Sequence, residues 1–320
     1  MSSEAEFVEK YRSIWRHYEM LLEEADKADP SGSVDELPRL YRQLCQHLSI
    51  ARHRGYRASV VDRLNQLVER GHGLLYGTRT GRWGPILSYI GGGFARDVRQ
   101  DWHLFAIAAV LFFGPFLAMI GWLQVEPEWA YHVLGPDRAS QMETMYSEPS
   151  VRPLSETDSD VMMFGFYIYN NVSIALRTFA SGLVAGIGSL FTLVYNGSVI
   201  GAAAGHVQNA GYGGHFWSFV VGHGAFELTA IVLSGQAGFK IGFAPIWPGR
   251  RRRLQALQEE ARDSVGLVGG FFVMLVIAAF IEAFWSSSPV SASVKYLVGG
   301  LLWSAVILYF GFAGRGDEPG

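Results

Sequence analysis

The chain has 320 residues, of which 49% are hydrophobic and only 17% are charged, and its net charge is −3 at pH 7. This composition is typical of a membrane protein rather than a soluble enzyme. The nearly neutral charge, without an extended basic surface pattern, argues against nucleic acid as a partner. The single cysteine, Cys45, cannot form an internal disulfide, which fits a reducing cytoplasmic setting.

Residues 1–101 are rich in Arg, Glu, Asp and His and predict a cytoplasmic helical domain. The start of the chain lacks the three regions of a signal peptide, so we expect the first membrane span to act as the insertion signal. Ser33 is expected to open a capping box at the second of three helices. These helices place apolar residues at spacings of three and four: FVEKYRSIWRHYEMLLEEA, LPRLYRQLCQHLSIARHRGY and VVDRLNQLVERGHGLLY.

The N-terminal domain is expected to end in an interfacial amphipathic helix. The stretch WGPILSYIGGGFARDVRQDW places bulky apolar residues ahead of four charged ones, as in helices that lie on a membrane surface. The charged residues are Arg96, Asp97, Arg99 and Asp101.

A transmembrane domain is predicted for residues 102–314, followed by a short tail at 315–320. Residues 103–123 are apolar and long enough to cross a hydrocarbon core of about 30 Å at about 1.5 Å per residue. Arginines precede this span and an acidic loop, 124–160, follows it, so the positive-inside rule places the N-terminus in the cytoplasm and the loop outside. We therefore expect a multi-pass protein of the bacterial inner membrane.

Residues 161–206 are apolar but too long for one straight span. The strongest basic cluster of the chain is expected on the cytoplasmic side, so an odd number of crossings must separate the outer loop from it. Three crossings satisfy this condition, at roughly 161–179, 182–206 and 216–243, with a very tight turn near Ser181. In the alternative interpretation, one of these segments is re-entrant or interfacial. The basic cluster comprises Arg250, Arg251, Arg252 and Arg253.

Two further spans, 265–285 and 294–314, bring the expected total to about six membrane segments in an all-α polytopic protein. Glycines are dense in this half, as in GSVIGAAAG. They indicate close packing between helices, for which lipid provides no hydrophobic drive. Helix breaks around a pore or site are the second interpretation.

Polar side chains inside the predicted spans must turn away from lipid, because an unpartnered ionisable group is expensive in hydrocarbon. His223 and Glu227 lie four residues apart and share a helix face. Three interpretations stay open: a structural polar contact, a proton or ion pathway, and a metal site with His223 and Glu227 as candidate ligands. The predicted intramembrane polar cluster comprises Asn171, Asn196, His206, His223, Glu227 and Glu282.

Other chemistry is absent from the sequence. GGGFAR lacks the lysine and hydroxyl residue of a phosphate loop, HGAFE lacks the second histidine of a zinc protease, and no GxSxG turn occurs. We therefore expect no catalytic residues and no cofactor.

The run FASGLVAGIGSLFTLVYNGSVIGA, followed by HGAFELTAIVLSGQAGFKIG and AAFIEAFW, resembles the stage II sporulation protein M (SpoIIM) family. The resemblance covers roughly residues 96–314. In endospore formers, family members are associated with peptidoglycan-degrading partners at the septal membrane, which implies a membrane anchor or assembly platform rather than an enzyme. By position, the family motif would comprise Asn171, Asn196, Gly197, His223, Gly224, Phe226, Glu227 and Glu282.

Three functions follow as hypotheses. The first is a non-enzymatic scaffold linked to cell-envelope remodelling, whose N-terminal helices dock a cytoplasmic ATPase and whose outer loop meets a cell-wall hydrolase. The alternative is a transporter or channel with a polar path through His223, Glu227 and Glu282. An intramembrane metal enzyme is the third. The glycine-rich faces favour a homo-oligomer in the lipid bilayer.

Overall fold

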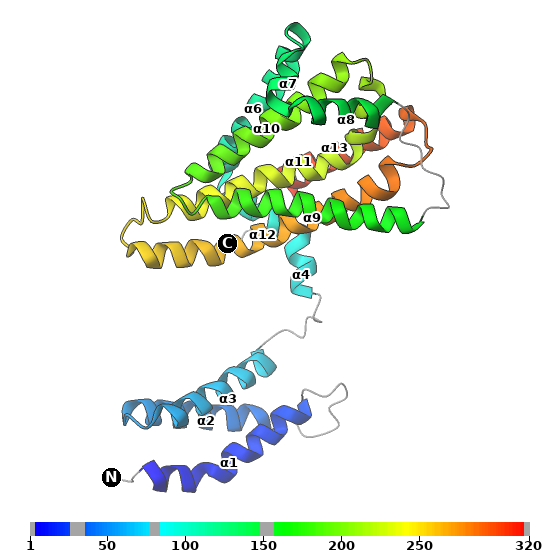
Figure 1. Ribbon diagram of the computed structural model, residues 1–320. Helices are drawn as coiled ribbons and strands as arrows, with labels where there is room; N and C mark the ends of the chain where they lie inside the picture. The colour runs from blue at the N-terminus through cyan, green and yellow to red at the C-terminus, as the bar shows by residue number, and fades with distance from the viewer. Residues whose placement is uncertain (1–3, 26–35, 77–83, 148–156, 317–320) are drawn as a thin grey trace. The chain divides into compact units, whose positions relative to one another are not determined.

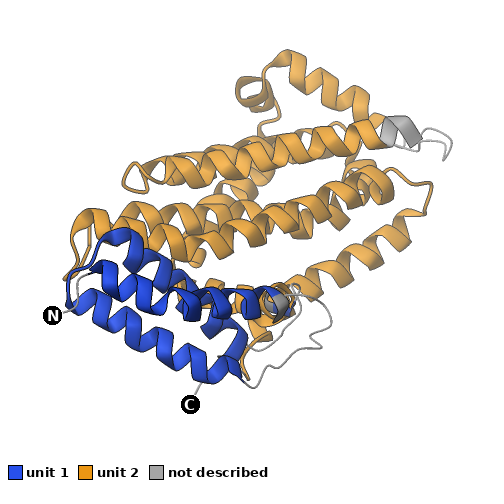
Figure 2. Ribbon diagram, turned by 90° about the horizontal axis from the view of Figure 1, so that it is seen from below, with its two compact units in different colours: residues 1–85 blue, residues 86–320 orange. Residues whose placement is uncertain are grey.

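The computed structural model describes residues 4–25, 36–76, 84–147 and 157–316 (Figure 1). These residues form helices and contain no strand, so the predicted all-α class is confirmed. The chain divides into two compact units, residues 1–85 and 86–320 (Figure 2).

The first unit contains three helices that pack pairwise around their own core. Apolar residues at helical spacing form this core, including Trp15 and Leu44. The indole Nε1 of Trp15 donates to His47 Nδ1 at 3.1 Å, and burial lowers the pKa of His47. Ser33, the expected cap, lies outside the described residues. The helices are α1 (Glu4–Ala25), α2 (Leu37–His53) and α3 (Ala58–Tyr76).

The predicted amphipathic helix is present in three consecutive pieces, α4 (Gly84–Ser88), the π-helical turn η2 (Tyr89–Gly93) and α5 (Phe94–Gln100). Phe94 and Val98 are buried in the core of the second unit. The compact units consequently divide at residue 85, ahead of the boundary at 101 that the charge pattern indicates.

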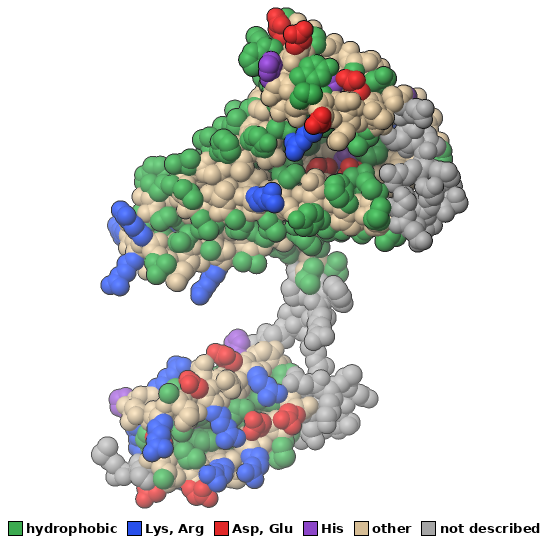
Figure 3. Space-filling view, viewed as in Figure 1, with side chains coloured by type: hydrophobic (Ala, Val, Ile, Leu, Met, Phe, Trp, Pro, Cys, Tyr) green, Lys and Arg blue, Asp and Glu red, His purple; other side chains and the backbone are tan. Residues whose placement is uncertain are grey.

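Among the described residues of the second unit, five helices are long and apolar enough to cross a membrane. On the face shown in Figure 3, hydrophobic side chains cover most of this unit, and Lys and Arg gather where α11 meets α12. This protein is therefore a polytopic helical membrane protein. The five are α6 (Trp102–Val125), α10 (Ile187–Asn209), α11 (Gly213–Phe243), α12 (Arg253–Phe280) with its π-helical extension η3 (Ile281–Ser286), and α13 (Ala292–Phe312).

The crossing expected at 161–179 forms α9 (Thr157–Ser181), a continuous helix of 25 residues. It is long enough to span a bilayer at about 1.5 Å per residue, but it is less apolar than the five spans because it carries Asn170, Asn171 and Arg177. Two short helices, α7 (Trp129–Leu134) and α8 (Pro136–Ser147), lie between α6 and α9 in the chain.

The turn between α9 and α10 is as tight as the three-crossing interpretation requires. It occupies residues 182–186, where Ala185 and Gly186 have φ values of 51° and 76°. Glycine adopts such left-handed conformations readily, and Gly182 lies directly against the backbone of Gly238 in α11. Residues 161–206 thus form parts of two long helices joined by a tight turn.

Close packing between α6 and α10 depends on three glycines spaced four residues apart. Gly197 and Gly201 lie against the carbonyl oxygens of Phe112 and Phe116, where a side-chain carbon would overlap, and Gly205 lies against the next turn of α6. This is the small-residue pattern that brings membrane helices together, so the packing interpretation is confirmed for these glycines.

Helix α11 is the centre of the bundle. It contacts α6, α9, α10, α12 and α13, and 61% of its apolar window is buried, more than in any other candidate span among the described residues. Its side chains therefore face protein over most of its length, which is where ionisable residues in a membrane are tolerated.

We expect Gly201→Val to destabilise the protein by about 1 to 3 kcal/mol, because the added carbons overlap Phe116 and force α6 and α10 apart. Thermal unfolding of the full chain in mild detergent measures the effect. Gly300→Val is the matched control, since nothing lies within 4 Å of a carbon added at Gly300. Equal melting of the two variants would contradict the packing account.

Candidate functional site

Three ionisable side chains meet inside the bundle. His223 and Glu227 lie one turn apart on α11, and Glu282 lies on η3. One ligand atom from each, a ring nitrogen or a carboxylate oxygen, lies within 4.8 Å of the other two. Glu282 reaches them from a π-helical turn, a rare geometry that frequently occurs at functional sites.

A serine holds the imidazole of His223. The ring is buried, and its Nδ1 lies 3.1 Å from Ser286 Oγ on η3. Its Nε2 lies 3.9 Å from Glu227 Oε2, which is too long for a hydrogen bond. The structural contact expected between His223 and Glu227 is therefore not a hydrogen bond, and the ring instead links α11 to η3.

The two carboxylates have few partners. Glu282 Oε2 is buried and makes no hydrogen bond within the described protein, and the side chain of Glu227 is only 17% exposed. A buried carboxylate without a hydrogen bond or a counter-charge costs several kcal/mol, on the order of the penalty for an unpaired ion. A proton or another bound cation would remove this cost.

A cavity of about 190 Å³ lies beside Glu282. Tyr146, from α8, forms part of its wall, and burial, followed by the nearby Glu282, raises the pKa of this tyrosine. The cavity is large enough for several water molecules at about 30 Å³ each. Its lining comes from α8, α9, α11 and η3: Met145, Tyr146, Met163, Phe166, Tyr167, Phe219, Glu282, Ala283 and Ser287.

The other residues of the predicted polar cluster contact side chains or backbone outside this group of three, although His206 Nε2 and Asn171 Nδ2, like Glu282 Oε2, are buried without a hydrogen bond among the residues that the structure describes. His206 Nε2, on α10, lies 3.0 Å from Glu143 Oε1 on α8. Asn196 Nδ2 donates to the Thr192 carbonyl on its own helix at 2.7 Å, and Asn171 Oδ1 accepts from Asn170 Nδ2 at 3.0 Å. Of the six predicted residues, the structure brings His223, Glu227 and Glu282 together.

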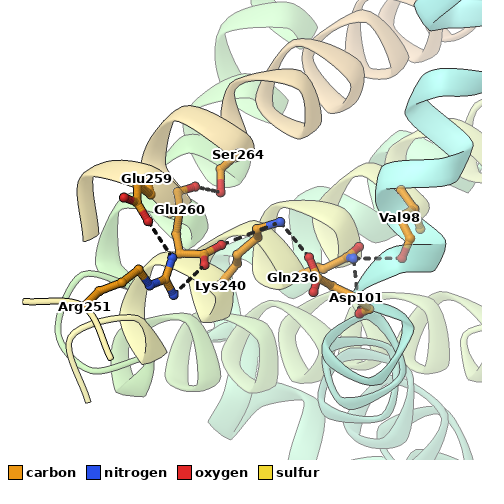
Figure 4. Close-up of polar contacts among 8 residues, drawn as sticks. All are labelled: Val98, Asp101, Gln236, Lys240, Arg251, Glu259, Glu260 and Ser264. Atoms are coloured by element: carbon orange, nitrogen blue, oxygen red, sulfur yellow. Dashed lines mark hydrogen bonds and ion pairs between the residues drawn. The ribbon is translucent and has the colours of Figure 1, made fainter. Parts of the chain in front are cut away.

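The predicted basic cluster supplies one partner to an ion-pair network. Arg251 Nη1 lies 2.9 Å from Glu259 Oε2, and its Nη2 lies 3.2 Å from Glu260 Oε1 (Figure 4). These pairs join the turn after α11 to the first turns of α12. Because all three side chains are at least one-fifth exposed, we expect each pair to contribute modestly to stability.

The part of this network that contains Lys240 and Gln236 was not predicted from the sequence. It joins α11 to α5 and to Asp101, the residue after α5. Lys240 Nζ lies 2.7 Å from Asp101 Oδ2 and 3.8 Å from Glu260 Oε2. One turn earlier on α11, Gln236 Nε2 donates to the Val98 carbonyl at 3.0 Å (Figure 4). A lysine near the end of an apolar helix was the available signal, since such a charge requires a partner.

We expect the carboxylate of Glu282 to contribute nothing to the stability of the folded protein. Glu282→Gln keeps the shape of the side chain and removes a carboxylate whose Oε2 has no hydrogen bond within the described part of the chain, so it should melt at or above the wild-type temperature in detergent with a chelator. Ser286→Ala removes the contact to the buried His223 ring and should cost about 1 kcal/mol. A clear loss of stability in Glu282→Gln would indicate a structural role instead.

Comparisons with known proteins support the family assignment. The model of "Stage II sporulation protein M" matches residues 104–287, which include His223, Glu227 and Glu282. A domain of unknown function matches residues 5–77. An uncharacterized protein of Methanocaldococcus jannaschii is 25% identical over 123 residues, covering 38% of this chain and 69% of that protein. No solved structure matches. Since the family model covers more than half of the chain, this protein belongs to the stage II sporulation protein M (SpoIIM) family.

Proposed function

We propose that this protein transports a cation across the membrane and binds it at His223, Glu227 and Glu282. The observation that carries the proposal is the convergence of two carboxylates and an imidazole within 4.8 Å on buried helices. Polar groups of this kind inside membrane bundles mark ion pathways. A bound cation would supply the positive charge that these residues lack.

Access to the site differs between its two sides. The cavity adjoins Glu282 on the side of α8. On the other side, toward the α5 end of α11, apolar side chains such as Leu233 and Phe271 fill the bundle core. An ion could reach the site from the first side but would meet a closed apolar layer on the second. This is the arrangement expected of one state in alternating access.

The ion-pair network of Figure 4 is suited to act as the gate on the closed side. Lys240 joins the end of α11 to Asp101 before α6 and to Glu260 on α12. Opening this end requires the helices to separate and these pairs to part. Discrete changes of partner at such contacts are a common basis of two-state transitions in proteins.

The orientation expected from the sequence fits this proposal. With the N-terminal unit and Arg250–Arg253 in the cytoplasm of a bacterial inner membrane, the gate faces the cytoplasm and the cavity faces outward. Acidic side chains lie from the end of α6 to the first turn of α8, on the expected outer side, including Glu126, Glu128 and Asp137. They would raise the local concentration of cations.

The scaffold role stays a prediction, together with its hydrolase and ATPase partners and the homo-oligomer. One observation favours a recruiting function for residues 1–85: they form a compact unit with a core of their own. A transporter with a separate docking unit would accommodate both roles. In this proposal, the site within the membrane serves transport, and residues 1–85 serve docking.

In liposomes that contain the full chain, we expect a cation flux that Glu282→Gln reduces at least tenfold, because the substitution removes one of the two site carboxylates. The matched control is Glu23→Gln, an exposed glutamate of α1 in the first unit. A panel of monovalent and divalent ions with ion-selective dyes measures the flux. Absence of flux across the panel, or equal flux in both variants, would refute transport through this site.

The gate makes a separate prediction. In a Cys45→Ser background, Ser234→Cys places a thiol at a fully buried position of α11 between the site and the gate. Lys240→Met should raise its labelling rate with a water-soluble maleimide several-fold, because the broken ion pairs favour the open end. Lys240→Arg keeps the charge and should change the rate little. Unchanged labelling in Lys240→Met would contradict the gate.

A further inference from the structure

We infer that the site of His223, Glu227 and Glu282 binds a divalent transition-metal ion of the zinc class. The inference names the ion that the proposed transport function would carry, and for the passage of that ion it rests on the proposed function. Binding of the metal ion to the site can be tested without any transport. Two carboxylates and one imidazole from α11 and η3 form the ligand set.

Charge balance selects a divalent ion. In a low-dielectric interior, net charge is costly. Metal binding requires both carboxylates to be deprotonated. With a neutral imidazole they then carry two negative charges, so a divalent ion makes the site neutral, whereas a monovalent ion leaves one charge uncompensated. Two buried or half-buried lysines have other partners: Lys295 Nζ donates to the Ser286 carbonyl at 2.7 Å, and Lys240 pairs with Asp101 and Glu260.

The imidazole selects a transition metal over magnesium or calcium. Neutral imidazole suits zinc, copper, iron and nickel, whereas magnesium and calcium prefer oxygen ligands alone. The buried His223 ring has the support that metal-ligating histidines have, because Nδ1 lies 3.1 Å from Ser286 Oγ. Ser286 is held in turn, since Lys295 Nζ donates to its carbonyl at 2.7 Å. Nε2 is then directed toward Glu227.

The spacing of the ligand atoms is close to what such an ion needs. Ligands about 2.0 to 2.1 Å from a tetrahedral zinc ion lie about 3.3 Å apart. His223 Nε2 and Glu227 Oε2 are 3.9 Å apart, and each of the three ligand atoms lies within 4.8 Å of the others. Side-chain rotations that move the ligand atoms by about 1 Å would bring all three to bonding distance of a metal ion.

Three protein ligands leave a fourth position, and a cavity adjoins this site. Closed four-ligand sites hold structural zinc, whereas three-ligand sites keep a position open for water or exchange. The cavity beside Glu282, of about 190 Å³, can supply that water and an entry route. An ion held by three ligands beside a hydrated cavity is able to leave, as transport requires.

The test uses the full chain in detergent with Co²⁺ as a spectroscopic probe. We expect one Co²⁺ per chain with visible d–d absorption of tetrahedral intensity, displaced by Zn²⁺ but not by Mg²⁺. Glu282→Gln and His223→Gln should each weaken binding at least tenfold. His206→Gln is the matched control, because His206 lies 3.0 Å from Glu143 on α8 and belongs to another contact.

A thermal shift separates loss of binding from loss of folding. Zn²⁺ should raise the melting temperature of the wild type, since a ligand that binds only the folded state stabilises it, and it should not raise that of Glu282→Gln. No stoichiometric Co²⁺ in the wild type, or an affinity for Co²⁺ in His223→Gln and Glu282→Gln equal to that of the wild type, would overturn the metal site.

Liposome flux with the same preparations distinguishes the two proposals. Metal binding that depends on Glu282, without flux of Zn²⁺ or Co²⁺, would support the metal site and overturn transport. Flux of a monovalent ion without any metal binding would overturn the metal site and leave transport standing. Glu282-dependent binding together with Zn²⁺ flux supports both.

Discussion

The cost of placing two carboxylates inside a membrane bundle is the constraint on which this structure depends. Glu227 and Glu282 lie on helices that lipid and protein surround, and Glu282 Oε2 has no hydrogen-bond partner within the described residues. A bundle that needed only stability would replace them with apolar side chains, which is often neutral or stabilising for buried charges. The proposed function explains their presence by a cation that binds at the site.

The rest of the bundle is arranged so that this site can exist. Helix α11 carries it and is covered by five other long helices, while glycines let α6 and α10 approach closely enough to complete the cover. At the far end of α11, Lys240 holds α5 and α12 in place through Asp101 and Glu260. The close packing, the candidate site and the proposed gate thus involve the same helix.

Much of the fold could be predicted from periodicity and hydropathy. The all-α class, the span that became α6 and the tight turn before α10 follow from local patterns. The sequence also singled out His223, Glu227 and Glu282, because ionisable residues stand out in apolar runs. What it could not predict was which of six polar residues meet, since this depends on how η3 packs on α11.

Three features of the site required the structure. The π-helical turn that aims Glu282 has no recognised sequence pattern. The cavity arises between α8, α9, α11 and η3, which are distant in the chain. The partner of His223 proved to be Ser286, 63 residues away, rather than its helical neighbour Glu227. Each is a tertiary property that local spacing does not encode.

X-ray absorption at the zinc edge, on the zinc-loaded full chain, tests the central claim most directly because it reports the ligands themselves. The account predicts one imidazole nitrogen and carboxylate oxygens at about 2.0 to 2.1 Å, with the imidazole signal lost in His223→Gln. A first shell of oxygen alone, unchanged by that substitution, would show that the buried cluster is not the metal site.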